Sequence, residues 1–314
     1  MFFNKNNNSI KGESLWNDAF NRLKKNRAAM AGGVVVVVLV IVAIFAPWIA
    51  PFHYAQGSFE DTYADPSGKY LLGSDFMGRD LLSRLIYGTR ISLMVGTLGA
   101  LFAFVIGTSF GTIAGYFGGK IDNIMMRIVD IFYAFPSLLF IILMMVLFKG
   151  ALVGDVERSL FVQYIAGLDK SLGGILFILV GISLTTWVDM ARLSRGMALS
   201  LRETEFIQAA QALGANNTRI MLKHLVPNLV SPLLVRVTLD IPTYIATEAF
   251  LSFIGLGVDP PTPSWGAMIQ EGIKSMRSYP HLTFFPGLAL AMTMLAFNFL
   301  GDGLRDALDP KMKQ

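Results

Sequence analysis

Long apolar runs alternate with short polar segments along nearly the whole chain. Six of these runs approach or exceed the roughly 20 residues that a membrane-spanning helix needs. They lie at 29–51, about 91–115, about 124–147, about 172–190, about 229–254 and about 283–303. A single strand in lipid would leave its backbone groups without hydrogen bonds, so we expect a helix even at the valine run 34–38. The pattern predicts an all-α integral membrane protein with six transmembrane helices.

Composition supports lipid as the surroundings of this chain. Of 314 residues, 54% are hydrophobic and 15% are charged, whereas soluble domains average about 25% charged residues. The net charge of +4 is modest, and no basic stripe interleaves with exposed aromatic residues, which argues against a nucleic-acid partner. The absence of cysteine excludes disulfides, thiolate metal sites and cysteine nucleophiles.

The distribution of Lys and Arg predicts the orientation. Their excess on one set of flanks places both termini in the cytoplasm. The polar start is too long for a typical cleaved signal, so we expect the first span to be retained. The expected organisation is a cytoplasmic segment 1–28, a first span 29–51, an extracytoplasmic loop 52–90, a core of five spans over 91–304 with a cytoplasmic loop 191–228, and a cytoplasmic tail 305–314.

Two stretches predict packing surfaces. In 14–27, apolar residues lie on one helical face behind a capping Ser14, which is typical of a helix in the membrane interface; a solvated tail is the alternative. In the second span, small residues recur every four positions and predict a close helix–helix contact, not a ligand site. They are Gly99, Ala103, Gly107, Gly111, Gly115 and Gly119.

Candidate chemistry is sparse. The stretch 114–121, "AGYFGGKI", imitates a phosphate-binding loop, but Ala114 replaces the first glycine and Ile121 stands where a Mg²⁺-binding hydroxyl is needed. The three histidines lack metal-ligand spacing. We therefore expect no catalytic residues, no metal site and no cofactor held by this chain.

The segment 203–228 is patterned as two short helices with a break. Phe206, Ala209, Ala210 and Leu213 recur on one face, and Gly214 is placed to stop the first helix. Asn216 or Asn217 would cap the second helix, which we expect to end before Pro227. The hairpin is either a docking surface for another protein or a loop folded against its own spans.

Ionisable residues also occur at membrane depth. These are Asp130 in the third span and Arg236, Asp240 and Glu248 in the fifth. Charges are costly in lipid, so they should face protein or a water-filled path. Arg236 and Asp240 are four residues apart and can pair on one helix face, and this pair is either structural or part of a path.

The hairpin resembles the coupling loop of bacterial ABC importer permeases. In "QAAQALGANNTRIMLKHLVP", Ala209, Ala210, Gly214 and Pro227 match the family pattern at its spacing. Three positions depart from it, with Gln208 for glutamate, His224 for isoleucine and Val226 for leucine. Four further stretches are similar to motifs of the peptide-importer branch of this family: "LLGSDFMGRDLLSRLIYGTRISLMVG" (71–96), "EAFLSFIGLG" (248–257), "PSWGAMI" (263–269) and "FNFLGDGLRDALDPK" (297–311). The start of the chain is similar to the oligopeptide permease subunits of that branch. One departure is the stretch 149–171, which is longer than expected between spans.

The resemblance implies a type I importer permease (MetI-like) fold in the inner membrane, with a cytoplasmic coupling helix. It also implies that the fifth span lies beside the translocation path, so we expect Asp240 and Glu248 to line this path before Asp130. The residues carried over to ATPase coupling are Glu205, Phe206, Gln208, Ala209, Ala210, Leu213, Gly214, His224 and Pro227. The implied partners are a second permease subunit, two ATPases that hold ATP and Mg, an extracytoplasmic binding protein, peptide substrate and lipid. Competing hypotheses are a dipeptide or nickel permease, a transporter without ATPases, and a membrane enzyme.

The outer loop 71–90 carries the charged residues of the motif at 71–96. We expect Asp80 to start a short helix there. Its charged residues would make salt links to a paired subunit or a docked binding protein, or the loop is a structural lid. The motif positions are Asp75, Gly78, Arg79, Asp80, Arg84 and Arg90.

Overall fold

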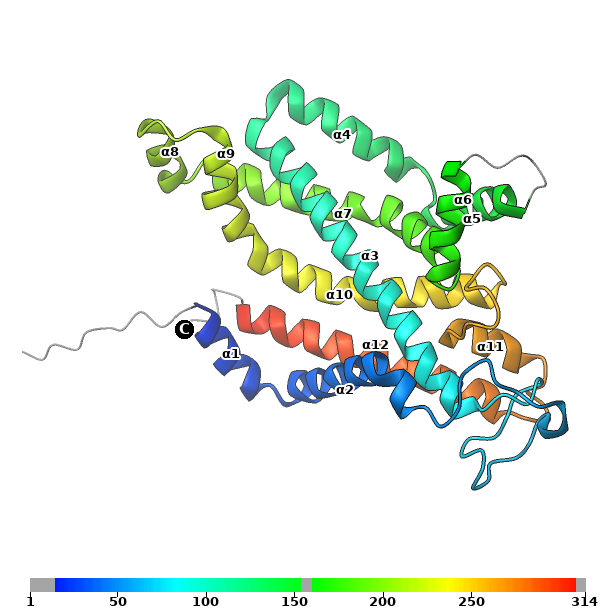
Figure 1. Cartoon of the computed structure of the whole chain (residues 1–314). Coiled ribbons are helices and arrows are strands. Elements are labelled where there is room, and N and C mark those ends of the chain that lie inside the picture. Colours follow the sequence, from blue (N-terminus) through cyan, green and yellow to red (C-terminus); the bar gives the residue numbers. More distant parts are fainter. Residues whose placement is uncertain (1–14, 154–159, 309–314) are drawn as a thin grey trace, which may run out of the picture.

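The computed structural model describes residues 15–153 and 160–308, and side-chain positions for residues 19–148 and 163–308. Ser14, part of the segment 149–171 and most of the tail 305–314 lie outside the described residues. The described chain is built from helices (Figure 1). They are α1 (Leu15–Lys25), α2 (Arg27–Ile49), η1 (Phe59–Asp61), α3 (Leu81–Phe117), α4 (Gly119–Ala134), α5 (Ser137–Val153), α6 (Leu160–Ser171), α7 (Leu176–Arg202), α8 (Glu205–Ala212), α9 (Asn217–Ile220), the π-helical turn η2 (Met221–Leu225), α10 (Val226–Phe253), α11 (Trp265–Ile273) and α12 (His281–Leu308).

The predicted membrane helices are present. Among the described residues, five helices are long and apolar enough to span a bilayer: α2, α3, α7, the run Asn217–Phe253 that contains α10, and α12. A sixth span results if α4 and α5 are taken together. Val34, Val37 and Ile41 of α2 are exposed, and a helix that is apolar all round is typical of a membrane span. The predicted all-helical membrane fold is confirmed.

The second span begins earlier than expected. Helix α3 starts at Leu81, not near residue 91, because Asp80 caps it. The Asp80 carboxylate accepts hydrogen bonds from Ser83 N at 2.7 Å and from Ser83 Oγ at 2.6 Å, which satisfies the free amide of the first turn. The short helix predicted after Asp80 is the first part of this long helix.

The third span is bent, which the apolar run 124–147 did not indicate. Helices α4 and α5 meet at about 80°. Pro136 stands at the break, and Phe135 before it is extended at φ −88° and ψ 133°. Proline lacks the amide hydrogen and disfavours helical geometry at the residue before it, so the helix ends and a second one begins.

The stripe of small residues packs α3 against α7. A side chain on Gly107 would bring its Cβ to 2.6 Å from the Trp187 carbonyl oxygen, and Gly115 lies equally close to that of Arg195. At Gly111 an added Cβ would overlap α7 altogether. The prediction is wrong at Gly119, which has φ +56° and open space around it. That glycine serves the turn into α4 because φ in this region favours glycine.

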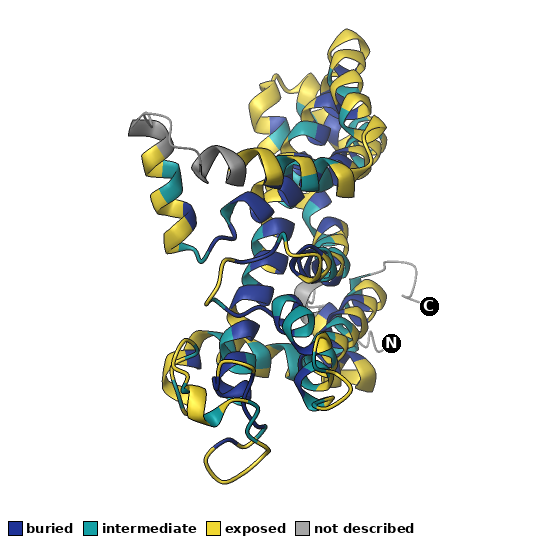
Figure 2. Ribbon diagram, turned by 90° about the vertical axis from the view of Figure 1, so that its right-hand side faces the viewer, coloured by how far each residue is buried: buried dark blue, intermediate teal, exposed yellow. Residues whose placement is uncertain are grey.

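The long helices place two polar regions at opposite ends of the molecule. Hairpin α8–α9 lies at the same end as α1 and the end of α12, whereas α11 and the loop before α3 lie at the other end (Figure 1). Exposed residues cover the outer faces of the helices and buried ones line the contacts between them (Figure 2). This arrangement separates the hairpin from the outer loop by the length of the spans.

Candidate functional site

The hairpin is held to the spans by its own apolar cluster. Ile207 of α8, Ile220 of α9 and Leu225 of η2 are fully buried and pack with Tyr116 at the end of α3. The Tyr116 hydroxyl donates a hydrogen bond to Asn217 Oδ1 at 2.9 Å. The hairpin is thus a rigid extension of α3, α7 and α10.

The turn between the two short helices has the expected chemistry. Gly214 adopts φ +82° and donates to the Gln211 carbonyl at 2.9 Å, while Ala215 N reaches the Ala210 carbonyl at 3.1 Å. These two bonds form the Schellman arrangement that ends helices at a left-handed glycine. Asn216 caps α9 by accepting from Arg219 N at 2.8 Å.

The end of the hairpin differs from the prediction. The second helix does not end before Pro227 but runs through the π turn η2 into α10. Val226 N bonds to Met221 O, which inserts one extra residue into the turn. Pro227 follows directly, in the first turn of α10, and the wider π turn before it accommodates a residue that has no amide hydrogen. His224 lies within this turn, and its backbone oxygen accepts from Asn228 Nδ2 at 2.6 Å.

One side of the hairpin is apolar and unpaired within the described chain. Leu213 is 89% exposed and Phe206 is 43% exposed, and Ala209 and Gln208 are exposed between them. Ala210 turns partly inward to the apolar cluster, so the predicted four-residue face divides between packing and surface. Glu205 starts α8 and is exposed as well. An exposed apolar group on a rigid hairpin is typical of a docking surface.

A second candidate region is a cavity of about 410 Å³ at the bend of the third span. Helices α4, α5, α7 and α10 supply its walls, with aromatic rings, threonines and three charged side chains. Its lining residues are Phe132, Tyr133, Phe135, Ser137, Leu138, Ile141, Ile182, Thr185, Thr186, Asp189, Arg236, Asp240, Thr243, Tyr244 and Thr247. Such a mixed lining, in a volume of this size, is typical of a ligand site.

The intramembrane charges divide between three places. Arg236 Nε donates to Asp240 at 3.0 Å, so the predicted pair exists and lines the cavity. Asp130 is exposed beside the cavity and pairs with Arg192 at 2.7 Å. Neither Asp130 nor Glu248 is part of the cavity wall.

Glu248 lies in the core instead of on a path. Its side chain is fully buried and accepts hydrogen bonds from Ser252 Oγ at 2.7 Å and Ser92 Oγ at 3.3 Å. Ser264 Oγ donates onward to Ser252 Oγ at 3.3 Å. The glutamate therefore ties α3, α10 and the start of α11 together, in contrast to the expectation that it lines the path.

Asp189 is a cavity residue that the sequence analysis missed. It is exposed on α7 at the cavity wall, four residues after Thr185. Its signal is a polar stripe at helical spacing, made by Thr185, Thr186 and Asp189, on an otherwise apolar helix. The predicted span ended at about residue 190, so Asp189 looked like a flank and not a residue at membrane depth.

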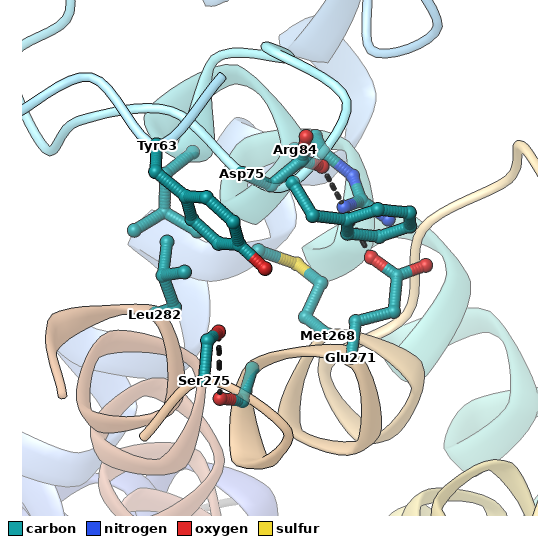
Figure 3. Close-up of a pocket in the computed structure, with 10 residues that line it drawn as sticks. Tyr63, Asp75, Arg84, Met268, Glu271, Ser275 and Leu282 are labelled. Atoms are coloured by element: carbon teal, nitrogen blue, oxygen red, sulfur yellow. Dashed lines mark hydrogen bonds and ion pairs between the residues drawn. The ribbon is translucent and has the colours of Figure 1, made fainter. Parts of the chain in front are cut away.

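The charged motif of the outer loop is paired inside the chain. Asp75 accepts from Arg79 Nε at 2.7 Å and from Arg84, and Glu271 of α11 accepts from Arg84 at 2.5 Å and Arg79 at 3.1 Å. Figure 3 shows Arg84 between Asp75 and Glu271. The side chains of Arg79, Arg84 and Asp75 are at most 6% exposed. Links to another protein are therefore wrong for these three residues, and the structural-lid alternative fits them.

The remaining motif positions shape the same lid. Gly78 has φ +67°, and an added Cβ would overlap the Ser58 carbonyl, so only glycine fits. Asp80 caps α3. Arg90 alone among the charged motif residues is exposed. Glu271, 187 residues after Arg84, was not predicted because sequence spacing carries no signal for so distant a contact.

Family comparison identifies the class of protein. Residues 107–314 match the model of the binding-protein-dependent transport system inner membrane component. Residues 14–66 match the N-terminal TM domain of oligopeptide transport permease C. The chain belongs to the family of binding-protein-dependent transport system inner membrane components, and it is a permease subunit of an ABC importer.

Individual relatives cover nearly the whole chain. The oligopeptide transport system permease protein OppC of Bacillus subtilis (strain 168) is 41% identical over 98% of this chain and 93% of its own length. OppC of Escherichia coli (strain K12) is 42% identical over 96% of this chain and 93% of its own. The dipeptide transport system permease protein DppC of Bacillus subtilis (strain 168) is 40% identical over 99% of this chain and 91% of its own.

A solved structure supports the fold. A chain of the MetNI methionine ABC transporter in an inward-facing conformation aligns with a TM-score of 0.56 at 19% identity, over 73% of this chain and 98% of that chain. At this identity the likeness concerns the fold, and it confirms the expected type I importer permease architecture. The family implies an ATPase and a substrate-binding protein as partners, and a multi-pass location in the inner membrane.

Proposed function

We propose that this chain is the permease subunit of an ATP-driven oligopeptide importer and forms half of its translocation path. The observation that carries the proposal is the match to oligopeptide permeases over nearly the full length. The polar cavity inside an apolar helix bundle supports it. A peptide has charged ends and many amide groups, so it needs such a wet passage through lipid.

A second permease subunit completes this path. The cavity is lined on one side by α4, α5, α7 and α10 of this chain, and a homologous subunit supplies the other side in a heterodimer. Arg236 and Asp240 are the predicted path residues that remain at the cavity wall.

The hairpin transmits movement from the ATPases. Phe206, Ala209 and Leu213 supply an exposed apolar surface, and the buried cluster beneath it joins this surface to the spans. The two ATPase subunits hold ATP and Mg with their own residues. When these subunits close, the hairpin would pass the movement on and rotate α7 and α10. This requires the hairpin and both termini to face the cytoplasm, in agreement with the Lys and Arg bias.

Dipeptide import is the second candidate, because a dipeptide permease is 40% identical over 99% of this chain. The test is reconstitution of the whole complex in vesicles, with its binding protein and a series of peptides from two to eight residues. Oligopeptide import predicts ATP-dependent uptake of peptides longer than two residues. Uptake restricted to dipeptides would favour the second candidate, and uptake that persists without hydrolysable ATP would refute an ATP-driven importer.

A further inference from the structure

We propose that the cavity at the bend of the third span binds the primary ammonium group of a peptide substrate through Asp189. The inference rests on the proposed function, since it assigns a chemical preference to the translocation path. It adds a residue that neither the motifs nor the family comparison single out. The group recognised is the amino terminus, and a lysine side chain carries the same chemistry.

The first step is the charge of the cavity wall. Asp189, Arg236 and Asp240 are its ionisable acids and bases. Arg236 Nε is bound to Asp240 at 3.0 Å, so this pair is close to neutral as a unit. Within residues 15–153 and 160–308, Asp189 has no hydrogen-bond or ion-pair partner among the contacts of the structure. The cavity therefore keeps one carboxylate for a cation from outside the chain.

The rim of the cavity does not alter this balance. Arg192 lies 4.0 Å over the ring of Tyr133, which lines the cavity. Its guanidinium is bound to Asp130 at 2.7 Å. This second pair also carries one charge of each sign. The cavity wall itself keeps one more carboxylate than it has guanidinium groups, although Arg236 also attracts Asp189 electrostatically.

The second step is the polarity of the neighbouring hydroxyl groups. Thr185 Oγ1 donates its hydrogen to the carbonyls of Gly181 and Ile182 at 3.1 and 3.0 Å. Thr247 Oγ1 donates to the Thr243 carbonyl at 2.8 Å. A hydroxyl has one hydrogen and two lone pairs, so both oxygens keep lone pairs free to accept, and both threonines line the cavity. Thr185 and Asp189 are four residues apart on α7 and share a helix face.

The third step is the match to an ammonium group. It carries three N–H donors and no acceptor, and the wall offers a carboxylate and hydroxyl acceptors. Tyr133 and Tyr244 add aromatic rings, whose faces attract cations. A neutral acetylated amine lacks both the charge and two of the donors. The cavity should therefore discriminate between a peptide and its N-acetyl form.

The test uses a single cysteine in the cavity. The chain has no cysteine of its own, so Thr243→Cys places one reactive thiol on the cavity wall. The assembled complex of permease and ATPase subunits is held in nanodiscs without the binding protein, since that protein selects peptides itself. The rate of N-ethylmaleimide labelling of this chain is followed by intact mass, against rising concentrations of trialanine or N-acetyl-trialanine.

We expect trialanine to slow labelling at about tenfold lower concentration than its acetyl form, the lower end of what a hydrogen bond to a charged group supplies. Asp189→Asn should remove this difference, and Asp189→Glu should retain it. The control Asp302→Asn changes an exposed carboxylate on α12 and should leave the difference intact. Equal protection by both peptides, protection by neither, or a difference that survives Asp189→Asn would overturn the proposal.

Three further measurements separate the possible causes. Protection by N-acetyl-Ala-Lys-Ala at the trialanine concentration would support the ammonium site and extend it to lysine side chains. If Asp189→Asn and Asp189→Glu both lose the difference and the complex dissociates, Asp189 binds a neighbouring subunit and the proposal fails. Uptake of trialanine with the binding protein and ATP tests the proposed function separately. If the labelling assay still distinguishes trialanine from its acetyl form but no uptake occurs, the importer function is refuted and the ammonium site is retained.

Discussion

Glu271 Oε2 accepts a hydrogen bond from Arg84 Nη1 at 2.5 Å, although the two residues are 187 positions apart. The contact fastens α11 to the start of α3, and Asp75 Oδ2 accepts from the same nitrogen of Arg84. Arg84 is 2% exposed. The charged motif of loop 71–90 suggested a binding surface for partner proteins, but its buried ion pairs instead hold the outer lid together.

Removal of Arg84 should strongly destabilise this lid. Arg84→Ala leaves the buried Asp75 and the partly buried Glu271 with one fewer cation, and breaking such a pair costs about 3–5 kcal/mol. We expect a clear fall in the Tm of the purified complex in detergent. Arg90→Ala is the matched control, because Arg90 is an exposed arginine of the same motif, and it should change stability by less than about 0.5 kcal/mol. Equal losses would show that burial of the clamp does not matter.

The close contact of α3 and α7 predicts a second loss of stability. In Gly107→Ala, the new Cβ lies 2.6 Å from the Trp187 carbonyl oxygen, so the helices must separate. Overpacking of this kind costs about 1–3 kcal/mol, more than alanine gains over glycine in a helix. Gly196→Ala on α7 is the control, because nothing lies near its added Cβ. The measurement is thermal unfolding of both variants, and a Gly107→Ala protein as stable as Gly196→Ala would contradict the packing.

The sequence supported those parts of the fold that depend on local patterns. Apolar runs placed the spans, the four-residue spacing of small residues predicted a close helix contact on α3 without naming its partner, and Gly214 placed the turn of the hairpin. Each of these signals acts within a few residues of the chain. Lipid also leaves few alternatives to a helix, which makes hydropathy informative here.

The parts that could not be predicted depend on distant contacts or on competing local signals. Glu271 meets Arg84 only because the whole fold brings α11 to α3. Pro136 breaks the third span, whereas Pro227 does not end a helix, since the π turn before it takes up the extra residue. Asp189 joins the cavity through the bend at Pro136, and that bend was itself not predicted.

The exposed face of the hairpin predicts a loss of coupling without a loss of folding. Leu213 is 89% exposed, so Leu213→Asp should leave the chain stable. A carboxylate that is desolvated in an apolar contact without a partner is costly, and we expect at least about tenfold lower ATP-driven uptake. The ATPase subunits should no longer co-purify with the chain.

The control for this hairpin variant is Thr218→Asp, in the first turn of α9 and also exposed. An acidic residue is favourable near a helix N-terminus, so this variant should keep uptake and co-purification. If Leu213→Asp retains both as well, the exposed apolar face is not the docking surface.

Two substitutions of Glu248 distinguish a structural role of this residue from a role in transport. Its two oxygens accept from Ser252 at 2.7 Å and Ser92 at 3.3 Å in the core. Glu248→Ala leaves these serine hydroxyls without their acceptor, at about 1–3 kcal/mol for each unsatisfied group, and should lower the Tm. Glu248→Gln retains an acceptor oxygen and nearly the same shape, so it should be much closer to wild type in stability. Since Glu248 is absent from the cavity wall, the glutamine variant should also import peptide at the wild-type rate. A glutamine variant that is stable but imports slowly would return Glu248 to the translocation path.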